Sequence, residues 1–332
     1  MRAAIPAGHD PARCTAYLVS QPSSRALHSR VTCCFIVACL LLFSCAATRA
    51  AASMPAPFPA GARIIYTAGT LGYLHPCATC AGSAQGGLAR RAHLLPQLAA
   101  ERPRSLVLAG PGEFYADRDP TASAGGDTLA TVLHAAFSAM PYAGVYLSPE
   151  AADGMKRLGL TPLPKGVPVT DSPAIHYYRT GPYTAGCVFL PPGGGDKGAP
   201  TREQVRSAQN AAREAGTRAR LVIGISPWGM EAENALMSEF AGHFHVILGG
   251  GPGIAIPGQA MNSGTGTGPL WVRSDRRGRA VNVLDIHSLP ETPSSPWLEG
   301  INFSSRLVFL EKNLPEDEEV KTIIRAVPYN KD

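Results

Sequence analysis

From residue 63 onward, short apolar runs alternate with segments in which apolar residues recur every three or four positions. Runs typical of buried strands stand at 64–67, 105–109, 142–147, 187–190, 221–225 and 245–248. Helical spacing stands at 88–101, 128–140, 202–216 and 230–240, with a short helical remnant at 154–160. Further short strands are predicted within 162–182, 270–286 and 305–310, and a charged, solvated terminal helix at 311–321. Strands that alternate with helices and then give way to a strand-rich end predict an α/β sandwich.

The first 50 residues have a different pattern. Residues 31–43 form an unbroken run of small and apolar side chains, preceded by Arg25 and Arg30. The run is shorter than the roughly 20 residues that a membrane-crossing helix needs, and with its basic flank it is typical of an export signal. Residues 42–45 resemble a bacterial lipobox, which makes Cys45 a candidate lipidation site and the membrane a partner through a lipid anchor. Cleavage among the alanines at 46–52 would instead release a soluble protein.

Composition and charge narrow the classes of protein. The chain has 332 residues, of which 45% are hydrophobic and 17% charged, and this excludes a disordered chain. The formal charge is +5, but residues 1–50 contribute +4 of it, so no nucleic-acid partner is expected. We therefore predict an export signal over 1–50, an Ala- and Pro-rich tether over 51–62 and one folded domain over 63–325, in the cell envelope or periplasm.

Three segments carry a resemblance to a known family. Ile-Ile-Tyr-Thr at 64–67, Gly-Gly-Leu-Ala-Arg-Arg-Ala at 86–92 and Leu-Val-Leu at 106–108 resemble the start of the UshA-type 5'-nucleotidases. These are exported enzymes of the calcineurin-like metallophosphoesterase superfamily. The resemblance implies a single-domain, four-layer α/β/β/α metallophosphoesterase-like sandwich.

The metal ligands of that family are not matched. Its Asp, His and Asn residues hold two ions that clamp a phosphate. The resemblance places these residues at positions where the chain has Gly69, Thr70, Leu71, Gly112, Glu113, Ser148, Pro149, Glu150, Pro227 and residues 250–253. We therefore expect no divalent metal cofactor. Residual nucleotide hydrolysis would need a different set, with Glu113, Glu150, His243 and His245 as weak candidates. A structural histidine pair is the favoured interpretation of the last two.

A Cys-x-x-Cys motif follows the first predicted strand. Ligands of α/β sheets bind beyond the carboxyl ends of the strands, so Cys77 and Cys80 are expected near the lost metal site. This spacing suits thiol exchange, which makes the two cysteines candidate catalytic residues. The motif resembles that of the UshA-like (seleno)proteins, in which a cysteine or selenocysteine precedes the Gly-Gly-Leu-Ala-Arg-Arg-Ala segment. A structural disulfide, or half a zinc site completed by His75 with His93 or Cys187, are the alternatives.

Three further side chains are candidate binding residues. Arg90 and Arg91 would bind an anion, or else belong to a solvated helix face, which is the favoured alternative. Trp228 would close a pocket or pack in the core. The function predicted is thiol redox chemistry or thiol-dependent binding, with a thiol or disulfide protein or a small anion as partner. The alternatives are a non-catalytic module that binds an anion or a protein, and residual phosphoester hydrolysis.

Overall fold

Two six-stranded mixed sheets form the centre of the structure, a computed structural model that describes residues 61–76, 84–114, 126–261, 268–291 and 295–326. The first sheet has the order β12 (Phe303–Phe309), β11 (Ala280–Ile286), β1 (Ala62–Thr67), β2 (Leu106–Ala109), β3 (Gly144–Leu147) and β4 (Gly166–Pro168). The second has the order β5 (Ala174–Thr180), β6 (Tyr183–Phe189), β7 (Leu221–Ser226), β8 (Val246–Gly249), β10 (Leu270–Arg273) and β9 (Ile256–Ala260).

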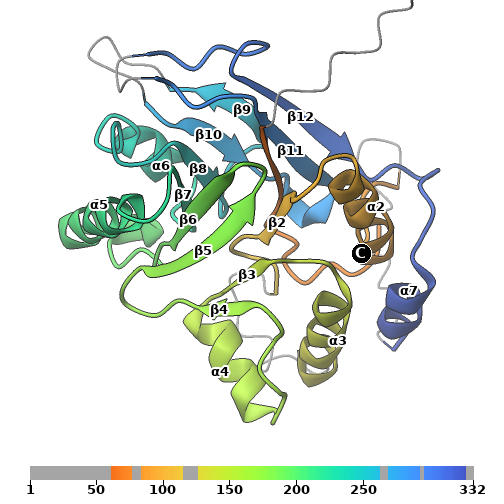
Figure 1. Cartoon of the computed structure of the whole chain (residues 1–332). Coiled ribbons are helices and arrows are strands. Elements are labelled where there is room, and N and C mark those ends of the chain that lie inside the picture. The colour runs from red at the N-terminus through yellow and green to blue at the C-terminus, as the bar shows by residue number, and fades with distance from the viewer. Residues whose placement is uncertain (1–60, 77–83, 115–125, 262–267, 292–294, 327–332) are drawn as a thin grey trace, which may run out of the picture. The chain divides into compact units, whose positions relative to one another are not determined.

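Helices cover the outer face of each sheet (Figure 1). The helices α2 (Leu88–Ala100), α3 (Gly126–Ala139), α4 (Pro149–Arg157) and α7 (Glu318–Ile324) share a hydrophobic cluster with the first sheet. The helices α5 (Arg202–Gly216) and α6 (Met230–Leu236) share another with the second sheet. Two short 3-10 turns, Asp196–Gly198 and Arg276–Gly278, lie in loops.

The central strands are apolar on both faces because each face has its own layer to pack against. On β1, Ile65 points to the helices while Ile64 and Tyr66 point to the other sheet. On β7, Val222 faces the helices and Ile223 the inter-sheet layer. Alternate side chains of a strand lie on opposite faces, so continuous apolar runs fill three hydrophobic layers. The predicted four-layer α/β/β/α sandwich is confirmed.

Local capping moves several helix boundaries from the predicted ones. The helix expected at 154–160 is α4, which begins earlier because Ser148 accepts a hydrogen bond from the Ala151 N–H. The terminal helix expected at 311–321 begins later, after Asp317 caps the Val320 N–H. The helix expected at 230–240 ends at Leu236. Within the described ranges, the structure holds no helix with the length and apolarity that crossing a membrane requires.

The inter-sheet layer is one of three hydrophobic cores, and its central side chains should contribute strongly to stability. Leu284 on β11 is fully buried between the sheets, and its replacement by alanine removes contacts on both sides. We expect Leu284→Ala to lower the free energy of unfolding by about 2–5 kcal/mol in denaturant titrations. Leu298→Ala, at a leucine that is 45% exposed, is the matched control and should cost far less. Equal losses in the free energy of unfolding for the two variants would show that the burial of Leu284 between the sheets adds no stability.

Candidate functional site

The strand ends of the two sheets meet at one edge of the sandwich. The Tyr66 hydroxyl at the end of β1 donates to the carbonyl oxygen of Gly249 at the end of β8, 3.2 Å away. A methyl group on Gly250 would collide with Pro111, which follows β2. Further backbone hydrogen bonds join the loops after β1 and β2, from Gly69 N to Pro111 O (3.0 Å) and from Leu71 N to Gly112 O (2.7 Å). In α/β folds this edge is where ligands bind.

A buried carboxylate, Glu113, is the centre of the first cluster at this edge. It is 1% exposed and accepts hydrogen bonds from the Thr67 hydroxyl (2.5 Å) and from the backbone N–H and hydroxyl of Thr70. The Arg91 guanidinium, from α2, lies 3.1 Å from the carboxylate and also donates to the Thr70 hydroxyl at 2.6 Å. The Tyr142 hydroxyl lies 3.0 Å from that of Thr67. The cluster is therefore a buried, hydrogen-bonded ion pair.

The second cluster is built around Glu233 on α6 and Arg273 at the end of β10. The two side chains form a buried ion pair, and the indole N–H of Trp271 donates to the same carboxylate oxygen at 2.9 Å. The second terminal nitrogen of Arg273 donates to the carbonyl oxygens of Gly250 (2.7 Å), Gly251 (3.2 Å) and Pro252 (2.9 Å). One guanidinium thus holds α6 and the loop after β8 together.

Glycine is required where the guanidinium groups pass the backbone. A side chain at Gly249 would collide with the Glu233 carboxylate and with Arg273. A side chain at Gly278, whose φ is +60°, would collide with the Arg91 guanidinium. The glycine-rich loop 249–253 therefore surrounds an internal cation, and the structure does not continue it into a helix that could hold a phosphate.

Burial and charge set the protonation of these groups. Burial acts to lower the pKa of Arg91, but the neighbouring Glu113 carboxylate and Tyr142 hydroxyl together outweigh it and the pKa is raised. Burial raises the pKa of Tyr142 to about 12, so its hydroxyl stays neutral. Burial also raises the pKa of Glu233, with Arg273 opposing that shift. Arg91 is therefore a permanent cation inside the protein.

The described residues do not fit a two-metal centre. Among them, no group of three or more His, Cys, Asp or Glu side chains could hold a metal ion. Glu113 is engaged by Arg91, and Glu150 is exposed in the first turn of α4. His245 accepts a hydrogen bond at its Nδ1 from the Val222 N–H at 3.1 Å, which favours a structural role. The structure does not bring the four weak candidates Glu113, Glu150, His243 and His245 together.

Two arginines that were expected on a solvated helix face are buried, so that expectation was wrong. Arg90 is 7% and Arg91 1% exposed, because α2 turns both toward the interior. Arg90 donates to the carbonyl oxygens of Ala84 and Gly86. The anion that Arg91 contacts is Glu113 of the same chain. Trp228 is 4% exposed and donates to the Pro191 carbonyl oxygen at 2.8 Å, as a core residue does.

The predicted cysteine sites, Cys77, Cys80 and Cys45, lie outside the described residues. Cys187 is described, and it is a free, fully buried thiol on β6. Burial raises the pKa of the Cys187 thiol well above its usual range, so it is not a reactive thiolate. The expectation for the Cys-x-x-Cys pair stays a prediction.

A pocket of about 190 Å³ lies where the described chain approaches the Cys-x-x-Cys motif. Leu74, His75 and Pro76 line it on one side, and α7 supplies Lys321 and Arg325 on the other. Pro76 directly precedes Cys77 in the sequence. The charged pattern around Lys321 predicts a solvated face and gives no sign of this pocket. Glu233 and Arg273 were not among the predicted site residues, although Arg273, a charged residue at the end of the apolar run Leu-Trp-Val, was a usable signal.

Comparison of the structure with solved ones identifies the fold. A 5'-nucleotidase precursor from Thermus thermophilus matches with a TM-score of 0.59 and 15% identity, over 80% of this chain and 58% of that one. The sulfate thiohydrolase SoxB, also from Thermus thermophilus, matches with a TM-score of 0.60 and 16% identity, over 81% and 60%. The calcineurin-like phosphoesterase YfkN from Bacillus subtilis matches with a TM-score of 0.57 and 15% identity, over 80% and 96%.

The chain therefore has the fold of the calcineurin-like phosphoesterases, including 5'-nucleotidases. It spans about three fifths of the length of the first two structures. No protein-family profile matches the sequence, and no curated protein sequence matches it either.

Removing the Glu113 charge should leave Arg91 as an unpaired buried cation. We expect Glu113→Gln to lower the free energy of unfolding by about 3–5 kcal/mol in denaturant titrations. Glu150→Gln, at an exposed position, is the control and should change stability little. The double variant Arg91→Met with Glu113→Leu should lose less than the two single changes together, because no charge is left unpaired. If the double variant loses as much free energy of unfolding as the two single variants added together, the two side chains are not directly coupled.

His245 should make stability sensitive to mild acid. Burial lowers its pKa, so the folded state keeps the imidazole neutral. The unfolded chain binds a proton below about pH 6.5, so stability should fall as the pH drops from there toward the folded pKa. In His245→Asn the amide oxygen can still accept from Val222, and unfolding measured between about pH 7.5 and 5.5 should show a smaller slope. Gln97→Asn, at an exposed residue with no titratable group, is the control and should retain the wild-type slope.

Proposed function

We propose that this chain is an exported protein of phosphoesterase fold that has lost its metal ligands and works through the thiols of Cys77 and Cys80. The observation that carries the proposal is the pairing of two buried carboxylates, Glu113 in the loop after β2 and Glu233 on α6, with arginines. Glu113 and Glu233 are ligand types that metal ions accept, but each is already neutralised by a buried guanidinium. A divalent ion would have to displace a charge that is fixed to the chain, at a large cost in desolvation.

The position of the motif in the sequence supports thiol chemistry. Residues 74–76 enter the Cys-x-x-Cys segment from the strand-end edge, and the Leu88 N–H holds the Leu74 carbonyl oxygen at 2.9 Å. Folds do not fix reactions, and the solved structures of this fold include a protein named a sulfate thiohydrolase. A thiol reaction at the margin of the sandwich is compatible with an unchanged core.

The proposed reaction is thiol–disulfide exchange. One thiolate of the pair attacks a substrate disulfide, forming a mixed disulfide while the leaving sulfur departs with the electron pair and takes up a proton. The second thiolate then attacks the mixed disulfide and releases the other substrate thiol. The substrate gains two electrons and the protein is oxidised to a Cys77–Cys80 disulfide. A protein dithiol in the envelope would return it to the reduced state.

The first 50 residues support the cellular setting of this proposal. A short apolar run behind arginines is typical of export, and Cys45 would anchor the protein if it is lipidated. Disulfides form and persist in envelope compartments. The second candidate is a non-catalytic module that binds a small anion or a protein partner. The cations Lys321 and Arg325 at the pocket are the observation that favours it.

The reduction potential of the Cys77–Cys80 pair tests the proposal. We expect thiol trapping in glutathione buffers to give a potential near or above about −230 mV, the range of redox catalysts. A potential below about −300 mV would indicate a structural disulfide and would overturn the redox role. A Cys77→Ser, Cys80→Ser variant gives the trapping signal of the other cysteines, which is subtracted. Metal analysis of the same protein should find no stoichiometric Zn, Mn or Fe, whereas metal-dependent phosphatase activity would favour the residual hydrolase.

A further inference from the structure

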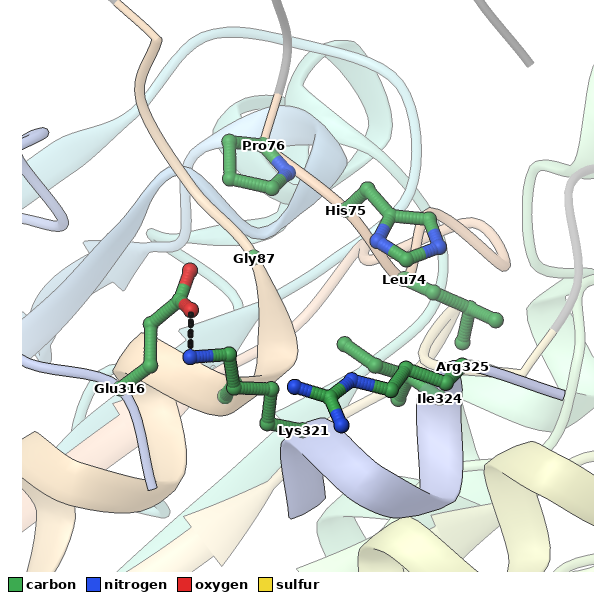
Figure 2. A pocket seen from close by; sticks show the side chains of 9 residues that line it. Leu74, His75, Pro76, Gly87, Glu316, Lys321, Ile324 and Arg325 are labelled. Atoms are coloured by element: carbon green, nitrogen blue, oxygen red, sulfur yellow. Dashed lines mark ion pairs between the residues drawn. The ribbon is translucent and has the colours of Figure 1, made fainter. Parts of the chain in front are cut away.

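The pocket beside Pro76 has one charged wall and one apolar wall. Figure 2 shows Arg325 extending over Ile324 so that its guanidinium lies beside the Lys321 side chain, opposite Glu316. Leu74 and Ile324, which are 3% and 5% exposed, supply the apolar side. The volume of about 190 Å³ is below the roughly 300–1,000 Å³ of ordinary ligand pockets, so the pocket suits only a small ligand or one group of a larger ligand.

Among the residues that line the pocket, Lys321 and Arg325 are cations and Glu316 is the carboxylate. The Lys321 ammonium lies 3.3 Å from the Glu316 carboxylate and 3.2 Å from that of Glu318, which is not part of the lining. The guanidinium of Arg325, an exposed residue, has no ion-pair or hydrogen-bond partner in the part of the chain that the structure describes. The fork of a guanidinium fits a planar carboxylate through two parallel hydrogen bonds.

The start of α2 adds positive potential to the same pocket. Gly87 and Ala89 line it, Gly87 provides no side-chain cap, and the first turn contains no acidic residue. The Leu88 N–H donates to Leu74, but the N–H groups of Ala89 and Arg90 have no acceptor among the described residues. The buried Arg90 Nε has no hydrogen-bond partner among the described residues, but it forms an ion pair with the pocket residue Glu316 at 3.9 Å. Helix starts with free N–H groups attract anions.

We propose that this pocket binds a small organic carboxylate with an apolar body, and that this group belongs to the thiol or disulfide substrate of Cys77 and Cys80. The second half of the inference rests on the proposed thiol function. Arg325 binds the carboxylate, and Leu74 and Ile324 contact the apolar body. A single carboxylate matches the single excess cation, whereas Glu316 would repel a doubly charged phosphate.

The rates of two aromatic disulfides with the pre-reduced protein test the inference. 5,5'-Dithiobis(2-nitrobenzoate) carries carboxylates on its rings, and 4,4'-dithiodipyridine is neutral. After subtraction of the Cys77→Ser, Cys80→Ser background, we expect Arg325→Gln to slow the benzoate reagent about tenfold and to leave the pyridine reagent unchanged. Arg206→Gln, an exposed arginine of α5, removes the same charge elsewhere and should leave both rates unchanged.

Each other outcome overturns one defined part of the proposal. If Arg325→Gln slows both reagents equally, or no more than Arg206→Gln does, the pocket assignment fails while the thiol function stands. If neither reagent reacts with Cys77 or Cys80, the thiol function fails and with it the assignment of a thiol substrate. Fluorine NMR of the double-serine variant then decides the pocket itself. Binding of 4-fluorobenzoate but not 4-fluorobenzamide, lost in Arg325→Gln, supports a carboxylate site, and no selective binding overturns it.

Discussion

The structure of the strand-end edge depends on the pairing of two guanidinium groups that are cut off from water. Arg91 and Arg273 are each 1% exposed, and a buried charge is tolerated only when a partner and hydrogen bonds replace its hydration. Glu113 and Thr70 surround the first, while Glu233 and three backbone carbonyl oxygens surround the second. This requirement explains the local backbone, because Gly249 and Gly278 leave the space that the Arg273 and Arg91 side chains occupy.

The chain has the fold of the solved phosphoesterases together with two buried ion pairs near its strand ends. The three hydrophobic layers lie between the sheets and helices, and the loops beyond the strands add a few side chains to them, such as Leu74, Phe114 and Trp228. Arg91 and Arg273 supply fixed positive charge at this edge. A fixed charge neutralised by its own carboxylate stabilises loops, but it offers no open coordination position to a substrate. The chemistry proposed for the chain therefore lies at the margin of this edge.

The local pattern of the sequence was sufficient to predict the layers. Apolar runs at 64–67, 221–225 and 245–248 became β1, β7 and β8, because strands buried on both faces need unbroken apolar sequence. Helix boundaries were predicted less well, since α4 and α7 begin where Ser148 and Asp317 cap them. The sequence showed that the family's ligand positions are not matched, but it did not show the buried ion pairs of Glu113 and Glu233.

The sequence by itself determined the α/β architecture and the placement of a Cys-x-x-Cys motif after the first strand, because periodicity and spacing are local properties. Only the tertiary structure decided the partners of the charges. Arg91 lies 22 residues from Glu113, and Glu233 lies 40 residues from Arg273, so neither pair is a neighbour in any helix or strand. The arginines of α2 were predicted at the surface, and the fold turned them inward, since burial depends on which face the other layers cover.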